Sequence, residues 1–253
     1  MSIGRLAASR AIFVATLCST AMAASIAHAG PESLREGLFG ARPTEGPRGA
    51  PDVARYISEE GQTFVLDLSQ RRPLLKFENS PEVWALQPQP GPRGDTIYKN
   101  DQGEAMLRAT RLGGVTVFTD TRPGGSAAAL AGAGAPIRLA PLGPQALLER
   151  LAQASARASR AARRLIPFEA DASPGSSALI ADAAGVTAQA VVRITRRNDG
   201  GRVLARFSKV RLVEGKRPAA AIQDGVLRVT VSPGDGLAGR PSSDRIVAVA
   251  LSR

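Results

Sequence analysis

The stretch RYISEEGQTFVLDLSQRRPLLKFENSPEVWALQPQPGPRGDTIYKNDQGEAMLRATRLGGVTVFT, residues 55–119, decides the fold. It holds most of the aromatic residues of the chain, namely Tyr56, Phe64, Phe77, Trp84, Tyr98 and Phe118. Each of them lies in an apolar run of four to eight residues that is bounded by Gly, Pro, Asn, Asp or Ser, which is the pattern of a β-strand. We therefore expect short strands here, and we expect them to supply the hydrophobic nucleus.

Turn signals between such runs indicate antiparallel hairpins. A turn that contains Gly separates residues 54–58 from 62–68, 95–99 from 104–111, and 191–197 from 202–213. Further strand patterns cover residues 73–78, 82–87, 115–120, 225–231 and 244–252. Short strands at this spacing are typical of an antiparallel sandwich or a small barrel.

One long helical period follows Pro144 and covers residues 145–165. Its predicted apolar face consists of Leu147, Leu151, Ala154, Ala158, Ala162 and Leu165. Residues 176–185 suit a short helix, and the Gly, Ala and Pro content of residues 122–143 predicts a linker.

These patterns predict an α+β fold that is mainly antiparallel β, with sandwich or small barrel-like sheets and one long amphipathic helix. The predicted divisions of the chain are a signal peptide at 1–29, a flexible arm at 30–52, an N-terminal β lobe at 53–121, a Gly/Ala/Pro linker at 122–143, and a helix plus C-terminal β lobe at 144–253.

The first residues have the layout of a secretory signal peptide. Arg5 and Arg10 precede an apolar run at 11–17, and small residues follow, with the best cleavage site after Ala29. The run is shorter than the roughly 20 residues that cross a bilayer, and we expect no transmembrane segment later in the chain. The expected location is periplasmic or secreted.

Cleavage there removes the only Cys, Cys18, and the only His, His28. The mature chain then lacks thiol nucleophiles, disulfides, His-based acid-base catalysis and Cys/His metal sites. We accordingly expect no cofactor and no metal, and we favour a non-enzymatic role.

The chain is basic, with a formal charge of +11 that falls to +9 without Arg5 and Arg10. Two interpretations stay open. The excess of Arg over Lys reflects coding bias, or it attracts an anionic partner, which outside the cytoplasm means lipid head groups, surface polysaccharide or cell-wall polymer rather than nucleic acid.

Several segments resemble an uncharacterised family of exported proteobacterial proteins that is known only as a domain of unknown function. They are GQTFVLDLS (61–69), PLLKFENSPEVWALQPQPGPRGDTIYKND (73–101), LRATRLGGVTVFT (107–119) and GLAGRPSSDRIVAVA (236–250). The resemblance covers most of the chain from Asp52 onward. It implies export, but the family has no assigned activity, so the resemblance implies no catalytic residue.

The candidate binding surface combines rings with guanidinium groups. Its residues are Arg55, Tyr56, Trp84, Arg93, Tyr98, Arg108 and Arg111. Flat rings stack on sugars, and Arg forks pair with carboxylate or phosphate, so this set suits an anionic glycan. The alternative is that the rings form the core of a small sheet and the arginines lie in water at its rim.

The predicted function is that of an exported envelope protein with a non-enzymatic binding or structural role and an anionic or polysaccharide partner. One alternative is a carboxylate-dependent glycan-active enzyme that uses Asp67 and Asp95, because such sites need two carboxyls about 5–9.5 Å apart. Another is a protein–protein inhibitor or assembly module that presents residues 88–94.

Overall fold

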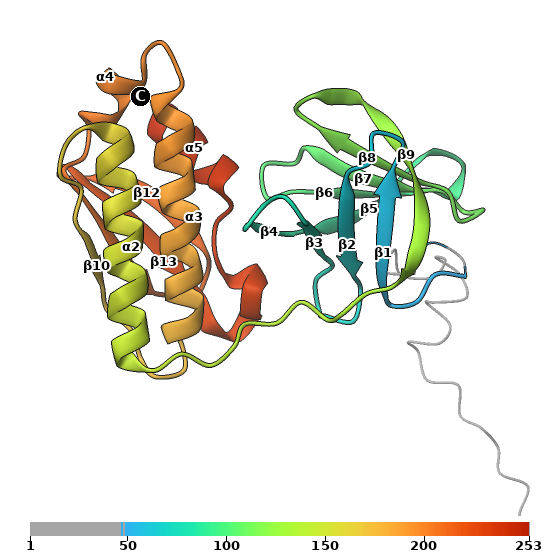
Figure 1. Cartoon of the computed structure of the whole chain (residues 1–253), viewed down its shortest axis with the longest axis horizontal. Coiled ribbons are helices and arrows are strands. Elements are labelled where there is room, and N and C mark those ends of the chain that lie inside the picture. The colour runs from blue at the N-terminus through green and yellow to red at the C-terminus, as the bar shows by residue number, and fades with distance from the viewer. Residues whose placement is uncertain (1–46, 48, 253) are drawn as a thin grey trace, which may run out of the picture. The chain divides into compact units, whose positions relative to one another are not determined.

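The computed structural model describes residues 47 and 49–252, so the predicted signal peptide and most of the predicted arm lie outside the described residues. The fold is mixed α+β. It contains a nine-stranded antiparallel, near-closed barrel and a separate four-stranded mixed sheet with several helices (Figure 1). The predicted fold class is confirmed.

The barrel is built from strands in the first half of the chain. These are β1 (Val53–Ser58), β2 (Thr63–Asp67), β3 (Leu74–Phe77), β4 (Val83–Ala85), β5 (Gln87–Pro90), β6 (Thr96–Lys99), β7 (Ala105–Ala109), β8 (Val115–Thr119) and β9 (Arg122–Ala133). Their order in the sheet is β4-β3-β2-β1-β9-β8-β7-β6-β5. The two end strands, β4 and β5, are separated in the chain by Leu86 alone. The sheet must therefore curl until its ends meet.

Aromatic side chains fill the barrel, as the sequence predicts. Tyr56 stacks on Phe64 with ring centroids 5.4 Å apart. The Phe77 ring centroid lies 5.7 Å from that of Phe64 and 5.5 Å from that of Trp84, with which it forms a T-shaped pair. Leu66, Leu75, Leu86, Tyr98 and Leu107 complete the buried centre. Burial of several such side chains, each worth about 1.5–3 kcal/mol, makes this interior the hydrophobic nucleus of the barrel.

The first two predicted hairpins are confirmed. β1 pairs with β2 across a turn in which Gly61 has φ 76°, and β6 pairs with β7 across a turn in which Gly103 has φ 83°. Residues 88–94, which the protein–protein alternative would present, continue as β5, which pairs with β6, and as the 3-10 turn η1 (Pro92–Gly94). Prolines are tolerated in β5 because it is an edge strand.

The third predicted hairpin is wrong. Residues 191–213 form the end of α3 (Ser177–Thr195), then α4 (Gly200–Leu204) and β11 (Lys209–Glu214). Val191 and Ile194 continue the buried helical face that starts at Leu179, and this tertiary burial overrides the β-branched composition. Gly200 is needed for packing rather than for a turn, because a Cβ there would lie 2.2 Å from the carbonyl oxygen of Ile194.

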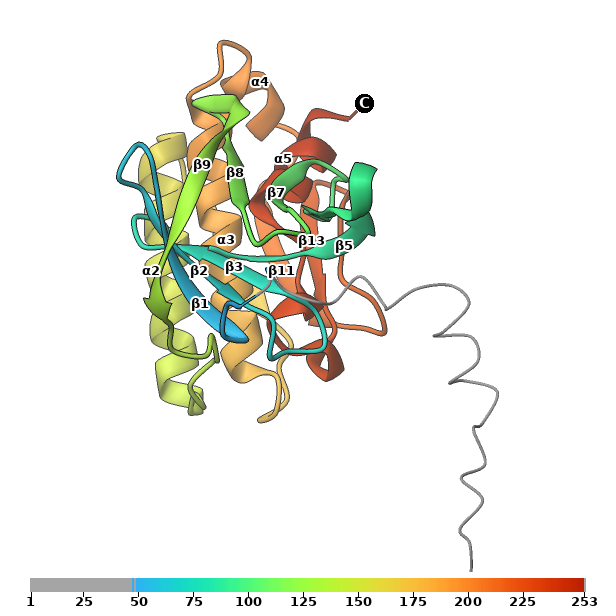
Figure 2. The same ribbon diagram turned by 90° about the vertical axis from the view of Figure 1, so that its right-hand side faces the viewer.

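The start of the predicted linker is also corrected, because residues 122–133 form β9. This strand pairs with β8 on one side and with β1 on the other, and Figure 2 shows it beside β8. Its small side chains leave room for side chains of the neighbouring strand β8, which lie close to its backbone. At Gly125, which has φ 88°, a Cβ would lie 2.6 Å from the Cγ2 atom of Thr116. The connection without regular structure is therefore limited to residues 134–143.

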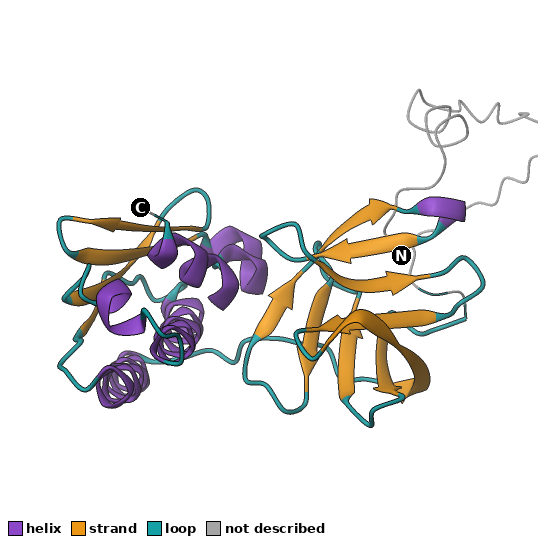
Figure 3. Cartoon of the chain, turned by 90° about the horizontal axis from the view of Figure 1, so that it is seen from above, coloured by secondary structure: helices purple, strands orange, loops and turns teal. Residues whose placement is uncertain are grey.

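The second half of the chain forms a sheet covered by helices. Strands β10 (Phe168–Ala170), β11, β13 (Val226–Val231) and β12 (Ala219–Gln223) lie in that order, the first three parallel and β12 antiparallel to β13. The helices α2 (Pro144–Ala162) and α3 cover one face (Figures 1 and 3). The predicted helix at 145–165 is confirmed, but it ends at Ala162 because Arg163 adopts φ 54°. Leu165 lies beyond this end and is exposed.

Among the described residues, α3 alone is long and apolar enough, by length and composition, to cross a membrane. The prediction of no such segment overlooked this helix. More than half of the apolar window is buried inside the structure, as is usual for a core helix.

Residues 244–252, predicted as a strand, form α5 (Ser243–Leu251). The run IVAVAL fits both a strand and a helix, and the N-cap decides: the Ser242 hydroxyl accepts a hydrogen bond from the Arg245 N–H at 3.0 Å. The preceding residues form the 3-10 segment η2 (Pro233–Gly239).

The helical assignment of α5 can be tested with two alanines. In a strand, positions 248 and 250 would share one face, whereas in α5 Ala250 is buried and Ala248 is exposed. We predict that Ala250→Leu lowers the free energy of unfolding by about 1–3 kcal/mol through overpacking. Ala248→Leu should change it by less than about 0.5 kcal/mol. Urea titration followed by circular dichroism measures both, and equal losses would contradict the helix.

Candidate functional site

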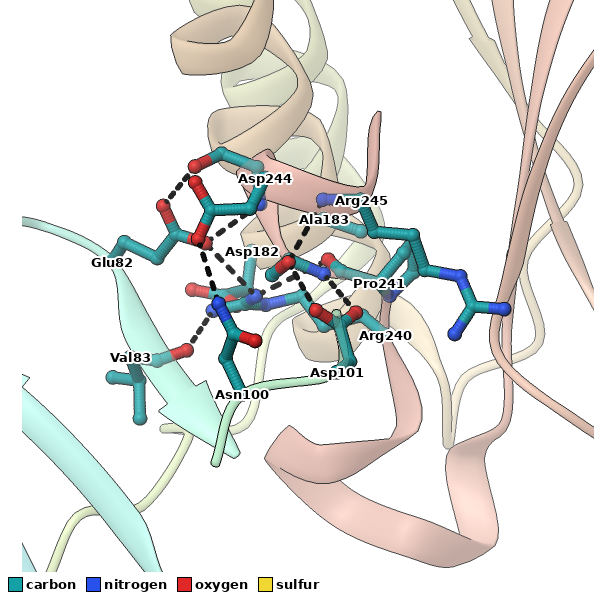
Figure 4. Close-up of polar contacts among 12 residues, drawn as sticks. Glu82, Val83, Asn100, Asp101, Asp182, Ala183, Arg240, Pro241, Asp244 and Arg245 are labelled. Atoms are coloured by element: carbon teal, nitrogen blue, oxygen red, sulfur yellow. Dashed lines mark hydrogen bonds and ion pairs between the residues drawn. The ribbon is translucent and has the colours of Figure 1, made fainter. Parts of the chain in front are cut away.

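A buried polar cluster joins the barrel to the start of α5, and we call it the Glu82 hub. Glu82, which precedes β4, is 3% exposed, and Arg240, which follows η2, is 5% exposed. Ser243 donates hydrogen bonds to both Glu82 carboxylate oxygens, from its N–H at 2.8 Å and from its hydroxyl at 2.6 Å. Arg240 donates to the Val83 carbonyl at 2.9 Å and pairs with Asp182 of α3 (Figure 4).

The first turn of α5 explains why carboxylates gather there. The N–H groups at a helix start have no partner within the helix, and the helix dipole favours negative charge at this end. Asp101, in the β6–β7 turn, accepts from the Ser242 N–H at 3.0 Å and from its hydroxyl. Glu82 takes the next N–H, that of Ser243. Two barrel segments thus satisfy the start of one helix.

Burial raises the pKa of Glu82, although Arg240 and the hydrogen bonds from Ser243 oppose this shift. Asp244 adds a further like charge that raises the pKa, and it pairs with Arg193 of α3. The hub therefore holds a carboxyl that gives up its proton less readily than an exposed one.

The predicted binding surface is only partly exposed. Tyr56 and Tyr98 are fully buried inside the barrel, and burial raises the pKa of each to about 12. The Nη1 atom of Arg55 lies 3.8 Å from Oε1 of Glu78, with which it forms an ion pair. Neither tyrosine ring can therefore stack on a ligand, and Trp84 is the aromatic residue of this set that lines a cavity.

The remaining arginines of the predicted surface gather at Asp95. Arg108 donates to this carboxylate from Nε at 2.7 Å, and that contact holds the pKa of Asp95 below its usual range. Arg93 and Arg111 are exposed nearby, and Arg93 has φ 59° within η1. These groups brace the loop before β6.

The two carboxylates proposed for catalysis have separate structural partners. Asp67 is fully buried and accepts hydrogen bonds from Ser69 and, at 2.8 Å, from the Ile137 N–H. Asp95 is engaged by Arg108. Asp67 thus ties the connecting segment to the barrel, and neither carboxylate lines the cavities beside Trp84.

A cavity of about 490 Å³ lies on one side of the hub, and we call it the basic cavity. Its cationic residues with no ion pair or side-chain hydrogen bond among the described residues are Arg72, Lys216, Arg217 and Arg245. Trp84, Gln87, Asn100 and Asp101 line the same space. None of these cations belongs to the predicted binding surface. Three of them lie in the β2–β3 and β11–β12 turns, each of which carries a basic pair followed by proline, Arg71-Arg72-Pro73 and Lys216-Arg217-Pro218, and Arg245 lies in α5.

Another cavity, of about 690 Å³, also reaches Trp84, and we call it the acidic cleft. Its charged residues are Glu82, Glu104, Asp120, Asp244 and Arg193, and its apolar wall includes Phe77, Met106 and Phe118. Arg193 is already paired with Asp244. The cleft therefore carries an excess of negative charge on a basic protein.

Comparison with known proteins gives one match. A family model described as "Domain of unknown function (DUF4908)" matches residues 33–250. No curated protein and no solved structure matches the chain.

Removal of Arg240 should strongly destabilise the fold. Arg240→Ala leaves the buried Glu82 and the partly buried Asp182 without their cation, so we predict a loss of about 3–5 kcal/mol in the free energy of unfolding. The matched control is Arg211→Ala, which breaks an exposed pair with Asp171 and should cost less than about 1 kcal/mol. Similar urea midpoints for the two variants would contradict the structural role of Arg240.

The raised pKa of Glu82 also predicts a pH effect. The folded protein holds this proton more tightly than the unfolded chain, in which a glutamate has a pKa of about 4.3. The stabilising contribution is complete below that value and is lost as the pH rises through the folded-state pKa. We predict that Glu82→Gln removes this loss, so its urea midpoint declines less than that of the wild type between about pH 4 and pH 7. Glu104→Gln, at an exposed position, is the control and should follow the wild type.

Proposed function

Because the chain belongs to DUF4908, a family defined by a domain of unknown function, its role has to be inferred from its own residues, and we propose that it is an exported, non-enzymatic envelope protein that binds an anionic saccharide. The observation that carries this proposal is a set of four cations around the basic cavity that have no ion pair within residues 47 and 49–252: Arg72, Lys216, Arg217 and Arg245.

Unpaired cations around one cavity favour an anion inside it. Screening at physiological salt acts over about 8 Å, so charges that surround a compact space act together on a ligand within it. Three of the four cations are arginines, whose planar forks bind carboxylate or phosphate through two parallel hydrogen bonds. A ligand that carries such groups would offset the mutual repulsion of these side chains.

The uncharged lining supports a saccharide. Trp84 supplies a flat ring, and the exposed Gln87 supplies an amide group that exchanges hydrogen bonds with hydroxyls. Asn100 lines the same space, but its amide group already donates to Glu104 and Asp244. Asp101 lies among them but is already engaged with Ser242. Cavities that bind small molecules combine an apolar wall with a few polar groups in this way.

Export rests on the leader. Residues 1–29 combine Arg5 and Arg10 with an apolar run and a small-residue cleavage site after Ala29. The resemblance to exported proteobacterial proteins agrees with this. In that compartment the abundant anionic polymers are surface and cell-wall glycans, which suit the charge of the cavity.

A carboxylate-dependent glycan-active enzyme is the second candidate, and the acidic cleft favours it. Glu82, with its raised pKa, lines this cleft together with Glu104, Asp120 and Asp244, beside Trp84. Such an enzyme needs one protonated and one ionised carboxyl. However, Ser243 already occupies both oxygens of Glu82. The absence of hydrolysis of cell-wall glycans by the wild type would remove this candidate.

Trp84 makes the binding proposal directly testable, because it is the only tryptophan of the chain. We predict that acidic glycans change its fluorescence, that the affinity falls as salt rises, and that Arg72→Ala/Arg217→Ala weakens binding at least tenfold, since one hydrogen bond to a charged group contributes about 1.5–3 kcal/mol. Arg160→Ala, at an exposed arginine of α2 outside the cavity, is the matched control. Failure of cell-wall polymer, lipopolysaccharide and acidic oligosaccharides to bind at low salt would refute the proposal.

A further inference from the structure

We propose that the saccharide is a chain of acidic sugar units that lies along a trough formed by the basic cavity and a second cavity beside it. This inference rests on the proposed function and adds the form of the ligand. The second cavity has a volume of about 360 Å³ and shares Arg72, Asp235, Leu237 and Ala238 with the basic cavity. Two adjoining spaces, each of ligand size, fit a repeating molecule better than a single small anion.

Cations line both cavities of the trough. The β2–β3 turn supplies Arg71 and Arg72, and the β11–β12 turn supplies Lys216 and Arg217. All four side chains are exposed. A chain with a carboxylate on each sugar unit would therefore meet a cation in both cavities, whereas a single acidic sugar would meet those of one cavity only.

The two cavities differ in charge. In the basic cavity Arg72, Lys216, Arg217 and Arg245 have no ion pair among the described residues, but in the second cavity Arg71 Nη1 lies 3.8 Å from Asp235 Oδ1. The Arg71 side chain is 90% exposed, and exposed ion pairs contribute little to the stability of the fold. An arriving carboxylate can therefore replace Asp235 as the partner of Arg71. The basic cavity would bind the first unit, and the second cavity would add affinity for a longer chain.

One wall of the second cavity is held in a fixed conformation. The segment from Ser232 to Gly239 is closed by a hydrogen bond from the Ser232 N–H to the Gly239 carbonyl at 2.6 Å. A Cβ at Gly239 would lie 1.9 Å from the carbonyl oxygen of Ser232, so only glycine fits there. Gly236 adopts φ 55° in the same segment. A wall that is ordered before binding reduces the entropy lost when the ligand binds.

The concave shape favours a glycan over an anionic membrane. Groups that line cavities contact a ligand that enters them, whereas a lipid surface meets exposed protrusions. Binding to anionic vesicles in preference to oligosaccharides is therefore an outcome that would overturn the inference.

The test compares oligomers of one acidic sugar on the whole chain. Galacturonic acid and its dimer, tetramer and hexamer are titrated against Trp84 fluorescence and by calorimetry, with maltotetraose as the uncharged control. We expect the tetramer to bind at least tenfold more tightly than the monomer, which exceeds the few-fold gain from the number of registers a longer chain can adopt. Maltotetraose should not bind measurably.

Three variants test which cavity supplies the higher affinity of the tetramer. Arg217→Ala should weaken binding of the monomer and the tetramer alike. Arg71→Ala should weaken binding of the tetramer by a larger factor than that of the monomer, which it affects only through Asp235, a residue shared by the two cavities. Arg160→Ala is the control. Equal affinity for all lengths, or no effect of Arg71→Ala on the tetramer, overturns the chain inference and leaves the proposed function standing. Failure of every acidic probe refutes both.

Discussion

The rest of the structure depends on the burial of one ion pair in contact with a helix start. Glu82 and Arg240 are removed from water, and each would be costly to bury alone, because the loss of hydration exceeds what an unpartnered charge recovers. Ser243, Asp182 and the Val83 carbonyl supply the remaining partners. Any displacement of β4 from the start of α5 would leave a buried charge without its partners, so this contact fixes the geometry between them.

The same hub lies between the basic cavity and the acidic cleft, which differ in charge. Arg240 lines the basic cavity, and Glu82 lines the acidic cleft. Because the hub satisfies its own charges, it adds little net field to either side, and the character of each cavity comes from side chains around it. Arg72, Lys216, Arg217 and Arg245 make one side positive, while Glu104 and Asp120 make the other negative. Trp84 lies where the two meet.

Local sequence patterns predicted those elements whose residues are compatible with only one type of secondary structure. The turns at Gly61 and Gly103 need positive φ, and Pro144 starts a clear 3.6-residue period, so two hairpins and α2 are predicted correctly. Residues 191–197 and 244–252 are short apolar runs that fit either a strand or a helix. Burial against distant residues decides the first, and the Ser242 N-cap decides the second. The site follows the same division. Trp84 is identifiable from its aromatic block, but the cations beside it come from two turns and from α5, which are far apart in the chain and which only the folded structure brings together.

Arg240 and the cavity arginines show why charge count alone does not identify a binding residue. Arg240 has partners in two different segments, Glu82 and Val83 at the start of β4 and Asp182 in α3, and its side chain is almost fully buried. An arriving anion would have to break these contacts and leave Glu82 unpaired, at a cost of several kcal/mol. Arg72 and Arg217 have no partner to lose within the described residues, so their full interaction with an anion appears as affinity. The arginines of this chain therefore have two uses. Those with partners inside the protein stabilise the fold, and those without such partners are available to a ligand.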